Sequence, residues 1–266
     1  MTTAGQFQRL QGRVCVVASV VGTLGEGVAQ RFADEGGIVV GMDRKDHAVG
    51  ALALQVDLAD EAQVHAAYEE AYRQFGRIDV IYNNAGIVDP GDRSALDVSL
   101  ETWNRVFAGN LTTAWLSCKH GIPFMLRSAQ PKGSVINTSS FLSGMGAASA
   151  QMAFNAAKAA VEQLSRDLGV HLARRGVRVN ALALGPIETP QITQMFDSLS
   201  REEVARRFIH YPMGRFGSVA ELAATAAYLA SDDSGFVTAA SFPIHAGIQG
   251  AFTVPVDLPA TSAAKA

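Results

Sequence analysis

Phe154 and Lys158 lie four residues apart in the segment AQMAFNAAKAAVEQL, whose apolar residues recur with the period of a helix. Side chains at positions i and i+4 project from one helix face, so the two residues mark a single candidate site. A lysine buried there needs a carbonyl, a water or a ligand hydroxyl as partner, because an unpaired buried charge is costly. Phenylalanine offers a ring but no hydroxyl, so the pair lacks an obvious group for moving a proton.

A second candidate site is the segment ASVVGTLGEG, which follows an apolar run and contains Gly22 and Gly25. Glycines let a backbone turn tightly and approach a phosphate, and helix N-terminal amides can face a pyrophosphate. A G-x-x-x-G-x-G loop in register with Gly25 would have glycines where Ser19 and Thr23 stand. The two hydroxyls could donate hydrogen bonds but also take up space, so the loop leaves dinucleotide binding open.

Asp43 ends the apolar run GIVVGMD, eighteen residues after Gly25. A carboxylate at that position can accept both ribose hydroxyls of NAD and would repel the 2′-phosphate of NADP. We therefore predict NAD in preference to NADP. The alternative is a plain turn aspartate, and the adjacent Arg44 weakens the preference for NAD.

These residues need a sheet to position them. Short apolar runs alternate with segments of helical period, which predicts an α/β fold: a doubly wound parallel sheet with helices on both faces. The apolar runs are continuous, which indicates strands buried on both sides. The predicted strands span residues 13–19, 37–43, 51–57, 77–86, 133–140, 177–186 and 239–247, and the predicted helices include 26–36, 61–76, 155–176, 200–210 and 218–232.

Composition excludes several classes of protein. The 266 residues carry 22 Lys and Arg against 25 Asp and Glu, so a net charge of −3 gives no reason to expect nucleic acid as partner. No run of about 18 apolar residues predicts a membrane span, and the start MTTAGQFQRLQGR lacks the apolar part of a signal peptide. Cys15 and Cys118 fit a reducing compartment. We expect a cytoplasmic protein.

Further motifs lie near the ends of the predicted strands: VDLAD (56–60), NNAG (83–86), NLTTAW (110–115), INTSS (136–140) and GPIET (185–189). With them the chain resembles the short-chain dehydrogenase/reductase family over about residues 10–250. The resemblance implies one Rossmann-like domain of three α/β/α layers over residues 1–266, with 251–266 as a C-terminal tail. It implies a cofactor-binding set of Ser19, Gly22, Leu24, Gly25, Asp43, Asp57, Leu58, Asn84, Ala85, Gly86, Lys158, Pro186, Ile187 and Thr189.

The resemblance also implies four catalytic positions. Ser140 would orient a substrate carbonyl, and Asn110 would anchor a water. Lys158 would hold the nicotinamide ribose and lower the pKa of a tyrosine that exchanges the proton. Phe154 stands at that tyrosine's position, and residues 83–210 contain no tyrosine. A positioned acid–base group contributes roughly 10²–10⁴-fold, so we expect weakened or altered proton transfer.

Three interpretations stay open. The first is an NAD(H)-linked oxidoreductase for a small or medium hydrophobic alcohol or ketone. The second is a non-redox enzyme on the same scaffold, of lyase, isomerase or cyclase type, with lost or vestigial cofactor binding. The replacement of loop glycines by Ser19 and Thr23 supports this interpretation. The third is a non-catalytic partner subunit. Departures from the family pattern at Ser19, Thr23, Leu184 and His245–Ala246 occur together, which favours natural divergence over one engineered change at Phe154.

Other side chains could take part in chemistry. His210 and His245 are candidate replacement acids, because histidine titrates near neutrality. Tyr211 lies beside His210 in the segment expected to cover the substrate, whereas the place of His245 after the last strand favours a structural role. Asp89 and Asp92 in VDPGDRS lie at the mouth of the expected crevice, but their composition is foremost that of a turn.

The family resemblance finally implies self-association through the two long helices around residues 100–128 and 152–175. The alanine-rich face of AAKAAVEQL suits close helix packing, so we expect a homo-tetramer or dimer. A small-molecule substrate is the other expected partner. We expect no metal site, because the sequence shows no cluster of metal ligands.

Overall fold

The core of the chain is a seven-stranded parallel sheet in the order β3-β2-β1-β4-β5-β6-β7. The structure is a computed structural model that describes residues 8–128, 132–146 and 151–251. Each predicted strand range contains one observed strand: β1 (Val14–Ala18), β2 (Ile38–Asp43), β3 (Leu52–Gln55), β4 (Val80–Asn83), β5 (Gly133–Ser140), β6 (Val177–Leu184) and β7 (Ser241–Ile244). The predicted tail, 251–266, lies outside the described residues apart from Ala251.

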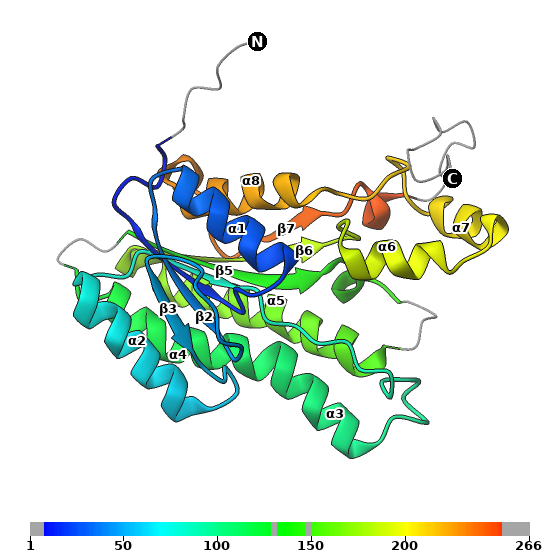
Figure 1. The fold of residues 1–266 in the computed structure, drawn as a ribbon, viewed down its shortest axis with the longest axis horizontal. Helices are drawn as coiled ribbons and strands as arrows, with labels where there is room; N and C mark the ends of the chain where they lie inside the picture. Colours follow the sequence, from blue (N-terminus) through cyan, green and yellow to red (C-terminus); the bar gives the residue numbers. More distant parts are fainter. Residues whose placement is uncertain (1–7, 129–131, 147–150, 252–266) are drawn as a thin grey trace, which may run out of the picture.

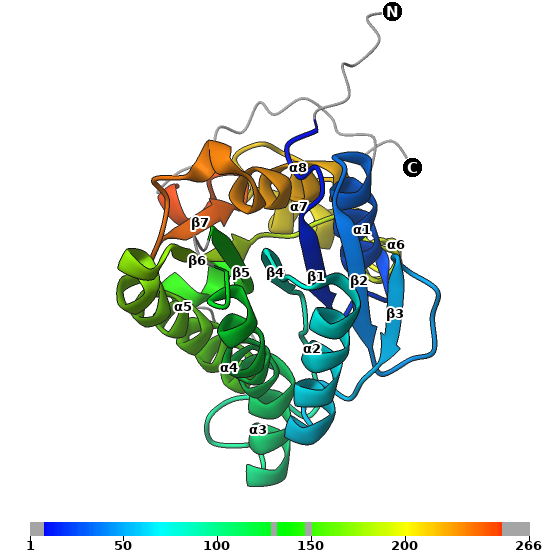
Figure 2. The same ribbon diagram turned by 90° about the vertical axis from the view of Figure 1, so that its left-hand side faces the viewer.

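Helices cover both faces of the sheet, as predicted (Figure 2). α1 and α8 pack on one face with Val17, Ile136 and Leu182, and α2, α4 and α5 pack on the other with Val16, Ile81 and Val135. The helices are α1 (Thr23–Asp34), α2 (Glu61–Phe75), α3 (Leu100–Phe107), α4 (Thr113–Met125), α5 (Met152–Leu172), α6 (Pro190–Asp197), α7 (Arg201–Phe208) and α8 (Val219–Ala230). Within the described residues, each helix is too short or too polar to cross a membrane.

The prediction that every strand is buried was wrong at the two edges of the sheet. Residues of β1, β4 and β5 are buried throughout, and both cysteines are buried in the core. In β3 the side chains alternate between half-buried and exposed, and β7 is only partly buried. An edge strand has a neighbour on one side only, so fewer atoms cover it.

The predicted helix over residues 100–128 is interrupted. A π-helical segment at Ala108–Thr112 separates α3 from α4, and Asn110 lies in its middle. Such segments arise where one residue is inserted into a helix, and they occur often at functional sites. The local sequence gives no periodicity that distinguishes this insertion from a regular helix.

The carboxyl ends of the strands face one edge of the molecule. The chain leaves β1 for β2 and β3 on one side and returns to β4 on the other, so the connections diverge between β1 and β4. Ligands of doubly wound sheets bind in the crevice at such a switch point. α6 and α7 lie beyond the carboxyl end of β6 (Figure 1). α6 was not predicted, although Thr189 and Pro190 are a recognisable helix start: Thr189 caps it and Pro190 is its first residue.

Candidate active site

The β1–α1 loop lies at the switch point and is held by two side chains from neighbouring strands. Asn84 Nδ2 donates to Ser19 O at 3.0 Å, and Asp43 Oδ2 accepts from Val21 N at 3.1 Å. The structure thus brings together three residues of the predicted cofactor set, Ser19, Asp43 and Asn84. Ser19 has a left-handed backbone, with φ of 62°, which side chains with a Cβ rarely adopt.

Two glycines shape this loop for different reasons. Gly22 precedes α1 with φ of 123°, and a Cβ there would meet nothing within 4 Å, so the loop surface is open. A Cβ on Gly25 would lie 2.5 Å from Ser19 O, so only glycine lets α1 pack this closely against the end of β1. Leu24, between them, is half-buried against the core on the α1 side of the sheet.

The predicted adenosine-side residues have unequal exposure. Asp43 is 5% exposed, and its second oxygen accepts from Lys45 N at 3.0 Å. Asp57 is exposed and accepts from Ala59 N, whereas Leu58 packs into the core. Asp43 and Asp57 therefore offer carboxylate oxygens at the crevice, and Leu58 could contribute only its main chain.

Lys158 is buried on α5 with 3% of its surface exposed. Its Nζ donates to Thr138 O at 3.0 Å and to Ala85 O at 3.2 Å, so backbone carbonyls satisfy the charge as the sequence required. Burial lowers the pKa of Lys158 to about 8. A Cβ on Gly86 would lie 3.2 Å from both Lys158 Nζ and Asn110 Oδ1, so this glycine keeps space open beside the amine.

Phe154 projects from the same helix face, with its ring centroid 5.8 Å from Lys158 Nζ. The start of α5 has no cap from its own Gln151; instead Asp92 accepts from Ala153 N and Phe154 N, each at 2.8 Å. Asp92 is 2% exposed and so does more than shape a turn. No local motif reveals this cap, because Asp92 lies 61 residues before Ala153.

Ser140 and Asn110 border the same space. Ser140 ends β5, is 6% exposed, and accepts a hydrogen bond from Leu142 N at 3.2 Å, which leaves its hydroxyl proton available to a substrate oxygen. Asn110 is 1% exposed, and its side chain donates to Ile87 O and accepts from Ile87 N. It thereby fixes the loop after β4 beside Ala85, whose carbonyl binds Lys158.

The segment after β6 connects the crevice to α6. Gly217 N donates to Pro186 O at 3.0 Å and Glu188 N donates to Gly217 O at 2.8 Å, so the main chain around Ile187 is paired with residue 217. Ile187 is buried, and Thr189 uses its hydroxyl to cap α6. These contacts hold the predicted nicotinamide-side residues beyond the carboxyl end of β6.

The candidate replacement acids lie in less suitable surroundings. Tyr211 packs edge-on against Phe208 and Phe216, and burial raises the pKa of its hydroxyl. His210 is exposed beyond α7, and His245 Nε2 lies 3.1 Å from Gln249 Oε1. None of these contacts joins the three residues to Lys158 or Ser140.

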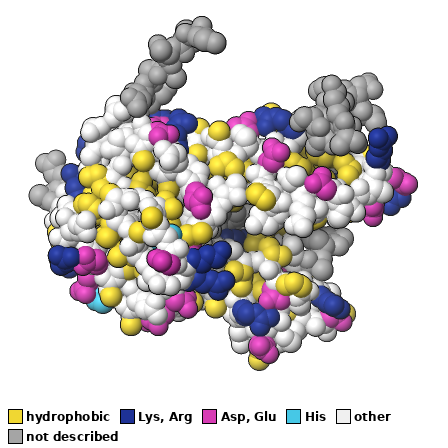
Figure 3. Space-filling model, viewed as in Figure 1, with side chains coloured by type: hydrophobic (Ala, Val, Ile, Leu, Met, Phe, Trp, Pro, Cys, Tyr) yellow, Lys and Arg dark blue, Asp and Glu magenta, His cyan; other side chains and the backbone are white. Residues whose placement is uncertain are grey.

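Apolar side chains are exposed in the segments that follow the carboxyl ends of the strands. Ile87 and Val88 follow β4, Met145 follows β5, and Met195 lies on α6. Figure 3 shows a hollow on this face of the molecule with hydrophobic side chains beside it. Exposed apolar side chains that gather around a cleft are typical of ligand-binding surfaces.

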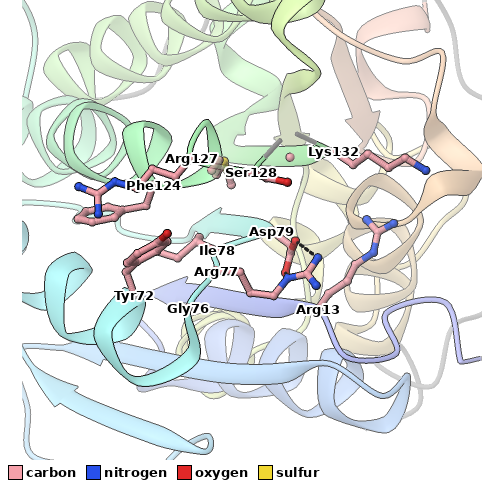
Figure 4. Close-up of a pocket in the computed structure, with 12 residues that line it drawn as sticks. Arg13, Tyr72, Gly76, Arg77, Ile78, Asp79, Phe124, Arg127, Ser128 and Lys132 are labelled. Carbon is pink, nitrogen blue, oxygen red and sulfur yellow. Dashed lines mark hydrogen bonds and ion pairs between the residues drawn. The ribbon is translucent and has the colours of Figure 1, made fainter. Parts of the chain in front are cut away.

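The cavity in Figure 4 lies at the opposite edge of the sheet, where Gly133 begins β5. Two of its arginines have carboxylate partners: Arg77 pairs with Asp79 and Arg13 pairs with Asp232, each at 2.7 Å. Its lining also includes the ends of α2 and α4, where helix dipoles favour positive charge. Local partners thus account for these cations, at the end of β5 away from Ser140.

Comparison with known proteins agrees with this architecture. A family model described as enoyl-(acyl carrier protein) reductase matches residues 20–249. The chain belongs to the short-chain dehydrogenase/reductase family and is an oxidoreductase of the nicotinamide-dependent class.

Individual relatives are dehydrogenases and reductases. A 2,5-dichloro-2,5-cyclohexadiene-1,4-diol dehydrogenase of Sphingobium indicum is 32% identical over 251 residues, which cover 90% of this chain and 97% of the relative. A meso-2,3-butanediol dehydrogenase of Serratia marcescens is 31% identical over 249 residues, covering 90% and 95%. The crystal structure of levodione reductase matches with a TM-score of 0.83 and 31% identity, covering 92% of this chain and 100% of the other. The redox interpretation is therefore favoured over the non-redox and non-catalytic ones.

Proposed function

We propose that the chain is an NAD(H)-linked oxidoreductase for a small or medium hydrophobic alcohol or ketone, with proton transfer weakened by Phe154. The observation that carries the proposal is the surroundings of Lys158. The amine is buried and satisfied, and Gly86 leaves room beside it, yet its i−4 neighbour on the helix face is a ring without a hydroxyl. The scaffold for binding and orientation is thus retained while the proton donor is absent.

The residues present fit a nicotinamide dinucleotide. Gly22 leaves the loop surface open, Asp43 presents a carboxylate at the end of β2, and Gly86 keeps a space beside Lys158. When bound, the nicotinamide supplies or accepts a hydride at the substrate carbon. Asp43 would accept hydrogen bonds from the adenosine ribose, and Lys158 would donate to the nicotinamide ribose.

The remaining side chains act on the substrate. Ser140 would donate its hydroxyl proton in a hydrogen bond to the carbonyl oxygen, which orients the carbonyl and stabilises negative charge developing there. Asn110 holds the loop after β4, so the apolar side chains of Ile87 and Val88 stay beside the site. Phe154 adds apolar surface but cannot exchange a proton. An apolar substrate matches this lining.

Titration with NADH and NADPH, followed by nucleotide fluorescence, tests the proposal. We expect NADH to bind below millimolar concentration and about tenfold or more tightly than NADPH, a difference of about 1.4 kcal/mol. Asp43→Asn removes the charge that repels a 2′-phosphate, so it should reduce the ratio of NADH affinity to NADPH affinity. Asp46→Asn, in the exposed turn nearby, is the matched control. Absence of binding by both nucleotides near millimolar concentration would refute an NAD(H)-linked function.

Assembly and location are part of the proposal. Phe236 and Val170 are exposed, as is Trp115 on α4, and β7 is a partly buried edge. Such surfaces support a homo-oligomer built through α4, α5 and the last strand, which light scattering would test.

Burial raises the pKa of both cysteine thiols, which keeps them unreactive and fits the proposed cytoplasmic location.

A further inference from the structure

A buried carboxylate lies behind the candidate site on the helix face of Phe154 and Lys158. Glu162 follows Lys158 by one turn of α5, and its side chain is 9% exposed. Residues at i, i+4 and i+8 share a helix face, and on this face Lys158 and Glu162 both contact β5. Glu162 belongs to neither the predicted catalytic nor the predicted cofactor set.

Glu162 bonds to residues on both sides of Ser140 in the sequence. Its Oε1 lies 3.2 Å from Ser139 Oγ and also accepts a hydrogen bond from Ser143 Oγ. Ser143 Oγ is 2.6 Å from Ser140 O, so its single proton is shared between that carbonyl and Glu162. The residue before Ser140 and the residue three after it are therefore tied to one carboxylate.

Further bonds fix the carboxylate and the helix. Glu162 Oε2 accepts from Arg166 at 3.0 Å, which compensates the charge of the buried group. Ser139 Oγ lies 2.9 Å from Lys158 O, so the end of β5 is also tied to the backbone of the lysine. Ser139, the residue before Ser140, thus joins Lys158 and Glu162 in one hydrogen-bonded network.

We propose that Glu162 is a positioning residue, which holds the turn from β5 into the 3₁₀ segment at Phe141–Gly144 and so fixes the Ser140 hydroxyl. Loss of the carboxylate would leave Ser139 bonded to Lys158 O and Ser143 bonded to Ser140 O, so the acceptor that joins the end of β5 to the turn would be missing and the turn would be free to relax. The inference rests on the proposed function, because the place of Ser140 matters for catalysis only if Ser140 binds the reacting carbonyl. A misplacement of about 1 Å can reduce a rate by about 100-fold.

Amide hydrogen exchange in the native chain tests the positioning directly. The Leu142 amide donates to Ser140 Oγ, so it reports on the turn, and the Ile136 amide within β5 reports on the core. In Glu162→Ala we expect Leu142 to exchange about tenfold faster or more while Ile136 is unchanged, because local opening is separable from global unfolding. Glu162→Gln, which keeps an acceptor oxygen, should restore part of the protection, and Asp167→Asn on the same helix is the control.

Ser143→Ala is a second variant, and it removes one link without removing the charge. It should also accelerate exchange at Leu142. Unchanged exchange at Leu142 in both Glu162→Ala and Ser143→Ala would overturn the proposal. So would equal acceleration at Ile136, which would mean that Glu162 supports only overall stability.

A kinetic cycle tests the consequence for Ser140 in a Phe154→Tyr background. Glu162→Ala should lower kcat about 10- to 100-fold and leave the NADH dissociation constant within about twofold. In combination with Ser140→Ala it should cause little further loss, because residues that act through each other are not additive. Independent losses that multiply would overturn the proposal. If NADH does not bind and Phe154→Tyr is inactive, the proposed function fails, and the exchange experiment still decides the positioning role.

Discussion

The α5 side of the crevice and the β1–α1 loop both differ from the family pattern, but they differ in kind. On α5, Phe154 belongs to a regular helix whose start is capped by Asp92, and Lys158 beside it has two carbonyl partners. In the β1–α1 loop, Ser19 has a left-handed backbone with φ of 62°. Ala246, which follows β7 elsewhere in the chain, has the same conformation with φ of 56°. That conformation costs a residue with a Cβ roughly 1–2 kcal/mol.

The comparison separates loss of chemistry from loss of stability. A helix surface needs no hydroxyl to form, so replacing tyrosine by phenylalanine removes a reactive group and leaves the backbone unstrained. The loop is held in place by Asn84 and Asp43, so its backbone keeps the glycine-like geometry even where serine stands. A single substitution on α5 should therefore restore activity, whereas a single substitution in the β1–α1 loop should increase stability.

The largest effect is expected from Phe154→Tyr. A phenol beside Lys158 restores a proton donor, so turnover of secondary alcohols with NAD, or of ketones with NADH, should rise about 10²-fold or more. Initial rates across a panel of such substrates measure the gain. Phe154→Leu also changes the ring but adds no hydroxyl, and it should bring no increase. An undetectable rate in Phe154→Tyr with NADH bound would show that more than the hydroxyl is missing.

Lys158 should give a stability effect with a defined pH dependence. Its pKa is about 8 in the folded chain and 10.5 without burial, so between these values the unfolded chain binds more protons. The unfolding free energy then rises with pH across this window, by up to about 3 kcal/mol, and the contribution is flat below it. Urea unfolding from pH 7 to pH 10.5 gives the unfolding free energy of the native chain and of Lys158→Met. Buried cysteines and tyrosines titrate in both chains, so their contribution cancels in the difference between the two free energies. A difference that stays constant over this range would contradict the assigned burial of the charge.

The sequence predicted what depends on local pattern. The strands follow from continuous apolar runs, and the parallel sheet brings the strand ends together, so Asn84 and Asp43 lie near enough to bond to the loop of Ser19. The roles of Ser140, Asn110 and Lys158 stay predictions, although the structure places Lys158 against the carbonyl of Thr138 on the Ser140 strand.

What the sequence missed depends on contacts between distant residues. Asp92 caps a helix that begins 61 residues later at Ala153, and no local motif marks a carboxylate for a distant helix start. Glu162 lies on an amphipathic helix where an acid usually faces solvent, yet it bonds to serines 19 and 23 residues before it. The π-helical segment around Asn110 was also missed: Gly109 and Asn110 are weak helix formers, but weak propensity does not reveal the type of interruption.

The smallest expected effect sharpens the loop side of the comparison. Ser19→Gly relieves the left-handed strain but adds freedom to the unfolded chain, so the net stabilisation should be about 0.5–1 kcal/mol, and Ala246→Gly should behave alike. Ala18→Gly is the matched control: Ala18 ends β1 in an ordinary strand, so glycine there should destabilise the chain by a similar amount. Urea midpoints at constant slope measure both. If Ser19→Gly lowered stability as Ala18→Gly does, the bonds from Asn84 and Asp43 would not be holding a strained serine, and the loop would have adapted to its side chain.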